Sequence, residues 1–147
     1  MGNQLTSVVI PERARKYFEA NKNVLVIEDD KIMGQMVAEI LEDVGFEVIT
    51  ATNGRIAFEK LTQRPVDFIV LDILLPEMDG FEIYSELQAY PAARDIPVMV
   101  ITAWSNEVNR RRAAEMGIQH FLPKPFTEDE LIYTIMTMLI DRSRQGK

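Results

Sequence analysis

The sequence predicts an α/β protein in which a five-stranded parallel sheet is covered by helices on both faces. From Asn23 onward, short apolar runs alternate five times with segments whose apolar residues recur at helical spacing. The runs are rich in β-branched residues and are not interrupted by polar ones, which is typical of strands buried on both faces of a parallel sheet. The 147 residues fit one domain with a hydrophobic core of its own.

The first strand–helix unit shows this pattern clearly. Val24–Ile27 is an unbroken apolar run that predicts a buried strand. Apolar residues then recur at helical spacing from Ile32 to Val44, and Gly45 ends the expected helix. Asp30 precedes this helix and is interpreted as its N-terminal cap.

Four further units follow in the same order. The later strands are expected over residues 46–51, 66–71, 97–101 and 118–122, and the helices after them over 54–63, 81–90, 105–116 and 127–142. Asp79–Gly80 opens the helix at 81–90, Gly117 closes the helix at 105–116, and Thr127 caps the last one. Such alternation requires crossover connections, which place helices on both faces of the sheet.

Residues 1–22 are expected to form an N-terminal extension outside the domain of residues 23–142, and residues 143–147 a frayed tail. Pro11 suits the first turn of a helix, which residues 12–21 could continue. The apolar residues 8–10 could pack on the domain or remain loose, and the sequence does not choose between these placements.

Composition excludes several classes of function. The chain has no cysteine and one histidine, which rules out disulfides, thiolate metal sites and multi-histidine metal sites. No apolar stretch reaches the roughly 18 residues of a membrane-spanning helix. With 16 basic and 23 acidic residues the net charge is −7, which argues against broad contact with nucleic acid. We therefore expect a cytoplasmic protein that binds neither membrane nor nucleic acid.

Polar side chains gather at the carboxyl ends of the expected strands, where open parallel sheets carry their sites. These positions hold Glu28–Asp30, Asp72, Thr102–Ala103 and Lys124. Clustered carboxylates repel one another unless a cation neutralises them, and Mg²⁺ prefers such oxygen ligands. With Lys124 the cluster suits a phosphoryl group, and Asp72 could be the nucleophile that forms an aspartyl phosphate.

Each of these residues also has an ordinary structural interpretation when it is taken alone. Asp72 could cap a turn, Lys124 could be a solvated loop residue, and Thr102 could be an unremarkable strand end. Their joint position at the ends of several strands favours a common site, while Asp30 and Thr127 are still assigned to capping.

Residues 23–142 resemble the receiver domain of two-component response regulators. The resemblance rests on Val24–Asp30, Asp72–Gly80, Val100–Ala103 and Lys124–Phe126, in this order and spacing. It implies a flavodoxin-like (βα)₅ fold and a phosphoacceptor switch, not an enzyme with an external substrate. A sensor histidine kinase or a histidine phosphotransfer protein would donate the phosphoryl group to Asp72.

The resemblance also implies roles for the residues around Asp72. Glu28, Asp29, Asp72 and the main-chain carbonyl of Leu74 would bind Mg²⁺. Thr102, Ala103 and Lys124 would bind the phosphoryl group, Thr102 and Phe121 would form the switch pair, and the Lys124–Pro125 bond would be cis.

Four positions depart from the usual family pattern. Glu28 replaces the commoner aspartate, and Phe121 lacks the hydroxyl of the tyrosine often found at its place. Leu74 and Trp104 lie where the family orients the attacking water, and neither side chain holds water in line. We therefore expect slow self-dephosphorylation, which Leu74→Asn together with Trp104→Glu should accelerate.

The sequence leaves several alternatives for how this domain acts on other proteins. The last helix carries a second apolar stripe, Ile132, Met136 and Ile140, and Arg110–Arg112 lie on the helix before it. The face formed by residues 105–142 could bind a downstream protein target or form a homodimer, or the N-terminal extension could cover the stripe. The chain could be a single-domain regulator or part of a larger protein. The main functional alternative is a receiver-like interaction module that works without phosphorylation.

Overall fold

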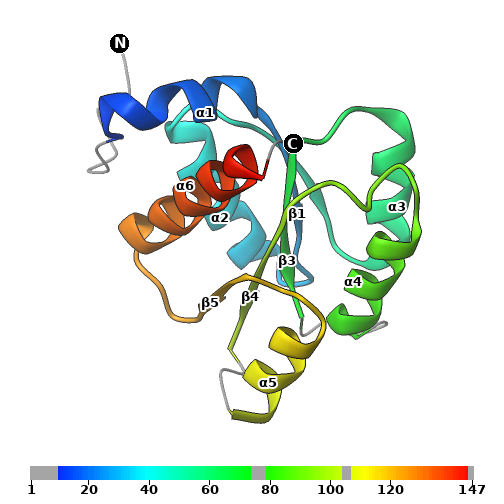
Figure 1. Ribbon diagram of the computed structural model, residues 1–147. Coiled ribbons are helices and arrows are strands. Elements are labelled where there is room, and N and C mark those ends of the chain that lie inside the picture. The colour runs from blue at the N-terminus through cyan, green and yellow to red at the C-terminus, as the bar shows by residue number, and fades with distance from the viewer. Residues whose placement is uncertain (1–9, 74–78, 104–106, 146–147) are drawn as a thin grey trace.

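The computed structural model describes residues 10–73, 79–103 and 107–145 and confirms the predicted architecture. A five-stranded parallel sheet with the strand order β2-β1-β3-β4-β5 forms the middle layer, and helices cover both of its faces (Figure 1). The strands are β1 (Asn23–Ile27), β2 (Glu47–Ala51), β3 (Phe68–Asp72), β4 (Val98–Thr102) and β5 (His120–Pro123). The helices are α1 (Arg15–Ala20), α2 (Lys31–Asp43), α3 (Gly54–Gln63), α4 (Gly80–Ala89), α5 (Glu107–Glu115) and α6 (Glu128–Arg144).

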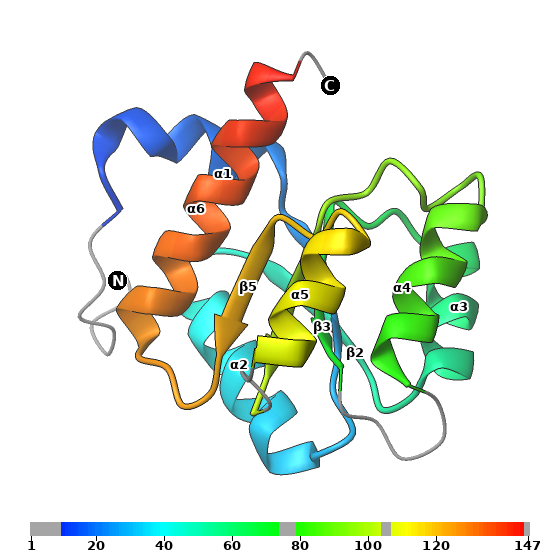
Figure 2. The same cartoon turned by 60° about the horizontal axis from the view of Figure 1, so that its bottom comes forward.

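Alternation along the strands divides the apolar side chains between two cores. Val24 and Val26 of β1 point to the face that α1, α2 and α6 cover, while Leu25 and Ile27 point to the face covered by α3, α4 and α5 (Figure 2). All four side chains are at most 1% exposed, as expected for a strand between two paired neighbours.

Helix starts follow the predicted caps. The Asp30 side chain accepts hydrogen bonds from the backbone N–H groups of Ile32 (2.9 Å) and Met33 (3.1 Å) at the start of α2. Thr127 and Glu130 form a reciprocal capping box at the start of α6. Asp30 therefore serves the helix, as expected, and not the acidic cluster next to it.

The strands β3 and β4 each end one residue later than the sequence predicts. The strands expected at 66–71 and 97–101 run from Phe68 to Asp72 and from Val98 to Thr102. Asp72 and Thr102 are thus the last residues of their strands, because the ladder pairs Asp72 with Ile101 and Thr102 with Pro123. Regular pairing therefore fixes the backbone of both polar residues.

The described part of the N-terminal extension, residues 10–22, is largely helical and contributes to the core. A 3₁₀ turn (Glu12–Ala14) leads into α1, which lies beside α6 in both ribbon views (Figures 1 and 2). Phe18 is 6% exposed and its ring centroid lies 5.1 Å from that of Phe46. Ile132 is buried in this same cluster, and Ile10 packs against it. The second apolar stripe of α6 was expected to be covered by a partner, by a second copy or by the N-terminal extension. Ile132 of this stripe is buried by residues of the same chain, while Met136 and Ile140 are half-buried.

Candidate functional site

Two neighbouring strands bring the predicted acidic residues to one edge of the sheet. Glu28 follows β1, and its backbone N–H continues the ladder by donating to the Ala51 carbonyl at 2.9 Å. Asp72 ends β3, the strand next to β1. Carboxylate oxygens of Glu28, Asp29 and Asp72 all lie within 4.8 Å of one another. This cluster, Glu28, Asp29 and Asp72, is called the acidic triad below.

The acidic triad is mostly withdrawn from water. Glu28 is 3% exposed and Asp72 2% exposed, whereas Asp29 is half-buried and open to solvent on one side. Two nearly buried carboxylates at this spacing are costly unless cations balance them. Hard oxygen ligands on a partly open cluster fit Mg²⁺, which keeps several of its waters.

Lys124 reaches the acidic triad from the loop after β5. Its Nζ lies 3.1 Å from Oε1 of Glu28 and 3.1 Å from Oδ2 of Asp72, and its side chain is 16% exposed. The Lys124 backbone N–H donates to the Thr102 carbonyl at 2.8 Å, which ties this loop to the end of β4. The Lys124–Pro125 peptide bond is cis. One ammonium group is therefore placed between two buried carboxylates.

The electrostatics show that one ammonium group does not fully compensate these acids. Burial raises the pKa of Glu28 to about 8; the hydrogen bond and charge of Asp72 add to this, and Lys124 opposes it. Burial lowers the pKa of Lys124, but the neighbouring carboxylates of Asp72 and Glu28 outweigh that effect and raise it overall. A second cation bound at the acidic triad would relieve this repulsion.

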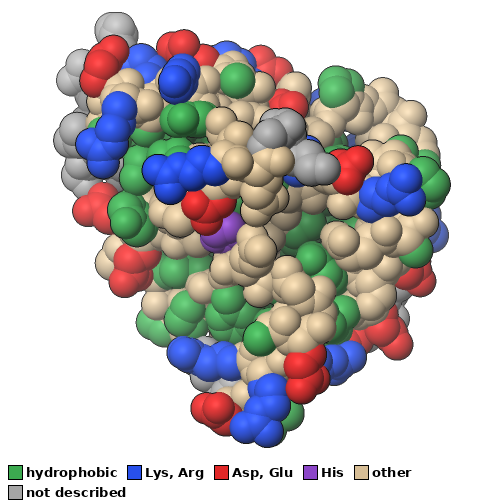
Figure 3. All heavy atoms as spheres, viewed as in Figure 1, with side chains coloured by type: hydrophobic (Ala, Val, Ile, Leu, Met, Phe, Trp, Pro, Cys, Tyr) green, Lys and Arg blue, Asp and Glu red, His purple; other side chains and the backbone are tan. Residues whose placement is uncertain are grey.

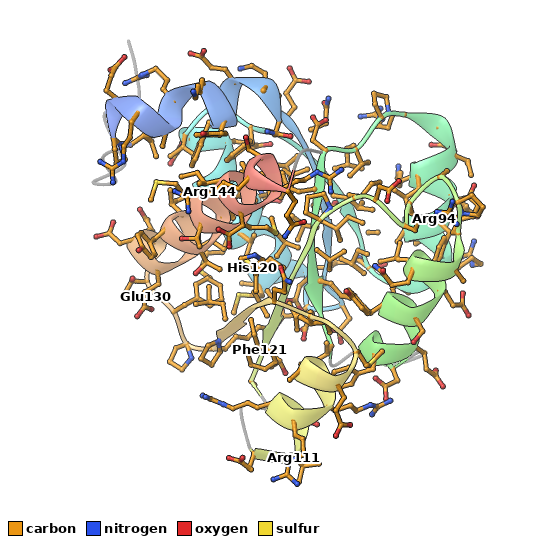
Figure 4. All side chains as sticks on the ribbon, viewed as in Figure 1. Arg94, Arg111, His120, Phe121, Glu130 and Arg144 are labelled. Atoms are coloured by element: carbon orange, nitrogen blue, oxygen red, sulfur yellow. The ribbon has the colours of Figure 1, made fainter. Side chains whose placement is uncertain are left out.

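The remaining predicted residues surround this edge. Thr102 is fully buried at the end of β4, and Ala103 follows it as an exposed residue. Phe121 of β5 is half-buried and packs against the core under α3, α4 and α5 (Figure 4). Leu74 and Trp104 lie outside the described residues. The structure thus brings Glu28, Asp72 and Lys124 into direct contact and places Thr102 on the adjacent strand.

Gly80 allows α4 to begin close to the end of β3. A Cβ atom built on Gly80 would overlap the Ile73 backbone and lie 2.9 Å from the Asp72 carbonyl oxygen. The Gly80 N–H donates to the Ile73 carbonyl at 3.1 Å, and Asp79 caps the helix through the Phe81 N–H at 2.8 Å. The Asp79–Gly80 pair therefore has two roles. Asp79 caps the start of α4, and Gly80 lets α4 begin close to the end of β3.

Sequence reasoning missed a contact between α5 and the start of α4. The Arg112 guanidinium lies over the Phe81 ring, 4.2 Å from its centroid, and 3.5 Å from Oδ2 of Asp79. Arg112 was expected, with Arg110 and Arg111, on a surface that binds a partner protein. Its guanidinium instead contacts Phe81 and Asp79 of the same chain. Consecutive residues of a helix point in different directions, so helical spacing could have shown that Arg112 lies on another face than Arg110 and Arg111. Nothing in the sequence pairs Arg112 with Phe81.

Comparison with known proteins identifies the class. The sequence model of the response regulator receiver domain family matches residues 24–136, so the chain belongs to this family. It is therefore a receiver domain of two-component systems, a family of signalling switches. Among curated relatives, the transcriptional regulatory protein CpxR of Escherichia coli is 33% identical over 116 residues, which are 79% of this chain and 48% of CpxR. The chain spans about half the length of the curated relatives it matches.

Solved structures agree with the fold. The chemotaxis protein CheY4 of Vibrio cholerae is 29% identical with a TM-score of 0.75, over 80% of this chain and 98% of that one. The response regulator TrrA of Thermotoga maritima, solved in complex with Mg(2+)-BeF, is 27% identical with a TM-score of 0.70, over 80% and 98% of the two chains. Within the described residues, no helix has both the length and the apolar character needed to cross a membrane.

Proposed function

We propose that this domain accepts a phosphoryl group on Asp72 in a Mg²⁺-dependent reaction. The observation that supports it most directly is the acidic triad with Lys124, in which Asp72 lies between acidic ligands and an ammonium group. An Oδ atom of Asp72 attacks phosphorus while the bond to the donor breaks. The metal and Lys124 would neutralise the phosphoryl oxygens during transfer.

Each neighbouring residue has a role in this proposal. Glu28 and Asp29 hold Mg²⁺ together with Asp72 and the Leu74 main-chain carbonyl. Lys124 exchanges its contacts with the acids for a phosphoryl oxygen, and the Thr102 hydroxyl and the Ala103 main chain bind the other oxygens. Thr102 moves toward the phosphoryl group, and the Phe121 ring follows it as a packing switch.

The partners follow from this chemistry. A sensor histidine kinase or a histidine phosphotransfer protein donates the phosphoryl group, as the family implies, in the cytoplasm. A downstream protein target binds the face formed by α5, β5 and α6. A second copy of the chain is the alternative occupant of that face, and light scattering with and without phosphodonor distinguishes the two.

A small phosphodonor tests the central proposal. Acetyl phosphate with Mg²⁺ should add the mass of one phosphoryl group to the wild type in intact mass spectrometry, and chelation of Mg²⁺ should prevent it. Asp72→Asn should abolish the addition. Asp30→Asn is the matched control, because it makes the same charge change next to the acidic triad and keeps a capping side chain.

The opposite result would favour the other function. If the folded wild type acquires no phosphoryl mass with Mg²⁺ present, the proposal fails and an interaction module that works without phosphorylation takes its place. If Asp72→Asn is still modified, the nucleophile is another residue.

A further inference from the structure

A pocket of about 250 Å³ lies at the amino-end edge of the sheet, opposite the acidic triad. It is formed where β4 and β5 begin and where α4 and α6 end, with Tyr84, His120 and Met138 among its walls. His120 lies beside an acidic side chain on this side of the molecule (Figure 3). Pockets for drug-sized ligands begin at roughly 300 Å³, so this smaller pocket suits a ligand well below that size.

Two withdrawn polar side chains that line the pocket, Tyr84 and His120, make no hydrogen bond to protein within the described residues. Tyr84 is 8% exposed, and within the described residues its hydroxyl makes no hydrogen bond. His120 has a side chain that is 13% exposed; in the same part of the chain its one polar interaction is with Asp141, at 3.7 Å, too long for a hydrogen bond. Withdrawn polar groups are normally hydrogen-bonded, so water or a ligand must complete these two.

The polar atoms face the pocket and not the core. No fully buried side-chain nitrogen or oxygen of the described residues lacks a partner, so the Tyr84 hydroxyl and the free nitrogens of His120 open to solvent. Both residues line the pocket. Burial lowers the pKa of His120, although the Asp141 charge opposes this, so at neutral pH the ring offers one donor and one acceptor.

The charges around the pocket balance. Arg94, Asp95, Asp141 and Arg142 all line it, and no ion pair joins these four side chains to one another in the described part of the chain. Figure 4 shows Arg94 near α4 and His120 near α6, so the pocket spans these two helices. Ile96, Pro97 and Val98 add an apolar wall between them.

We propose that this pocket binds a small zwitterion with an apolar body, of the size and kind of an aliphatic amino acid. Its ammonium group binds Asp141 and the acceptor nitrogen of His120, and its carboxylate binds Arg142. The Tyr84 hydroxyl supplies a further hydrogen bond, and the apolar body packs on Ile96 and Val98. Unpaired charges of both signs favour a ligand that carries both over a simple anion or cation.

Three matched probes test the charge pattern. L-leucine carries both charges, 3-methylbutylamine lacks the carboxylate, and 4-methylpentanoate lacks the ammonium group. Each is titrated to about 10 mM, the range of weak small-ligand binding, while the backbone amide resonances of Gly117 and Gln119 are followed by NMR. Leucine should shift these resonances in a saturable way, and each single-charge probe should bind about tenfold more weakly or worse.

Variants then locate the contacts. Asp141→Asn and Arg142→Gln should each weaken leucine binding by about tenfold, because each removes one charge-assisted hydrogen bond. Tyr84→Phe keeps the ring and should weaken leucine binding less than the two charge changes do. Glu59→Gln on α3, a helix that contributes no residue to the pocket, is the control and should change nothing, and the amide spectrum itself shows that each variant is folded.

Three results would overturn the proposal. The first is equal binding of leucine and 3-methylbutylamine, which would show that only a cation is recognised. The second is tighter binding of 4-methylpentanoate or inorganic phosphate, which would show an anion site. The third is the absence of any saturable shift at Gly117 and Gln119, which would leave water as the occupant.

Discussion

The two faces of the sheet are held together in different ways. On one face α6 buries five apolar side chains, Leu131, Ile132, Ile135, Met138 and Leu139. On the other face α5 buries one apolar side chain, Ala113, beside the polar Asn109. Burial of apolar side chains is the main source of helix attachment in a folded protein. The helix α5 is therefore much more weakly anchored than α6.

Aromatic contacts reinforce the difference. Phe18, Phe46 and Phe68 form a continuous row, with ring centroids 5.1 Å apart in each pair, that links α1 to β3. On the opposite face, α5 is tied to α4 by the exposed contacts of Arg112 with Phe81 and Asp79. The face with α6 is thus firmly held, while α5 on the other face costs less to displace than α6, which suits a switch.

Loss of the aromatic row should have the largest effect on stability. Phe18→Ala removes a nearly buried ring and should lower the free energy of unfolding by about 3 kcal/mol or more, as measured by urea denaturation. Phe58→Ala is the matched control on the opposite face, where the ring is only half-buried, and should cost clearly less. Equal losses would show that α1 is not part of the core.

Mg²⁺ should have the next largest effect. The ligands follow β1 and end β3, so bound metal should stabilise the fold by about 2.7 kcal/mol at a hundredfold excess over its Kd. Thermal unfolding with and without Mg²⁺ measures this, and Asp72→Asn should abolish most of the shift. Hydrogen exchange in α5 should slow less than in β1, because α5 supplies no residue of the acidic triad. An unchanged melting temperature in millimolar Mg²⁺ would contradict the proposed site.

Removal of the α4–α5 contact should have a smaller global effect and a clear local one. Arg112→Ala should lower stability by about 1 kcal/mol or less, because the contact is partly exposed, and should speed hydrogen exchange in α5. Arg111→Ala is the matched control, since its guanidinium lies 3.8 Å from Glu107 on an exposed surface. Faster exchange in both variants would argue against a specific role of Arg112.

The dependence of stability on pH should be the smallest effect, and it arises from His120 on the α6 side of the sheet. Burial lowers the pKa of His120 in the folded state, so the unfolded chain binds the proton more tightly. The stability that depends on a neutral His120 ring is fully present above the ordinary histidine pKa of about 6.5. It is lost as the pH falls through the lower pKa that His120 has in the folded state. His120→Gln should flatten the dependence of stability on pH below about pH 6.5. A change at higher pH would point to another group.

Much of the site could be predicted because it depends on strand ends. Asp72 and Thr102 follow apolar runs, and parallel strands bring such positions to the same edge whatever the details of packing. Direct contact of Lys124 with Glu28 was not predicted, because it depends on the path of the loop after β5. The contacts of Arg112 were not predicted for a similar reason: its partners, Asp79 and Phe81, are more than 30 residues away in sequence and are set by helix packing.

The sequence by itself determined the order of strands and helices, the caps and the edge of the sheet where the acids gather. Local hydrogen bonds and the periodicity of apolar residues encode these features, and both act over a few residues. Tertiary structure alone decided that α1 joins the core, that α5 is weakly held, and that a charge-balanced pocket forms at the far edge. Each of these depends on which surfaces meet after folding, and contacts between distant segments leave no periodic pattern along the chain.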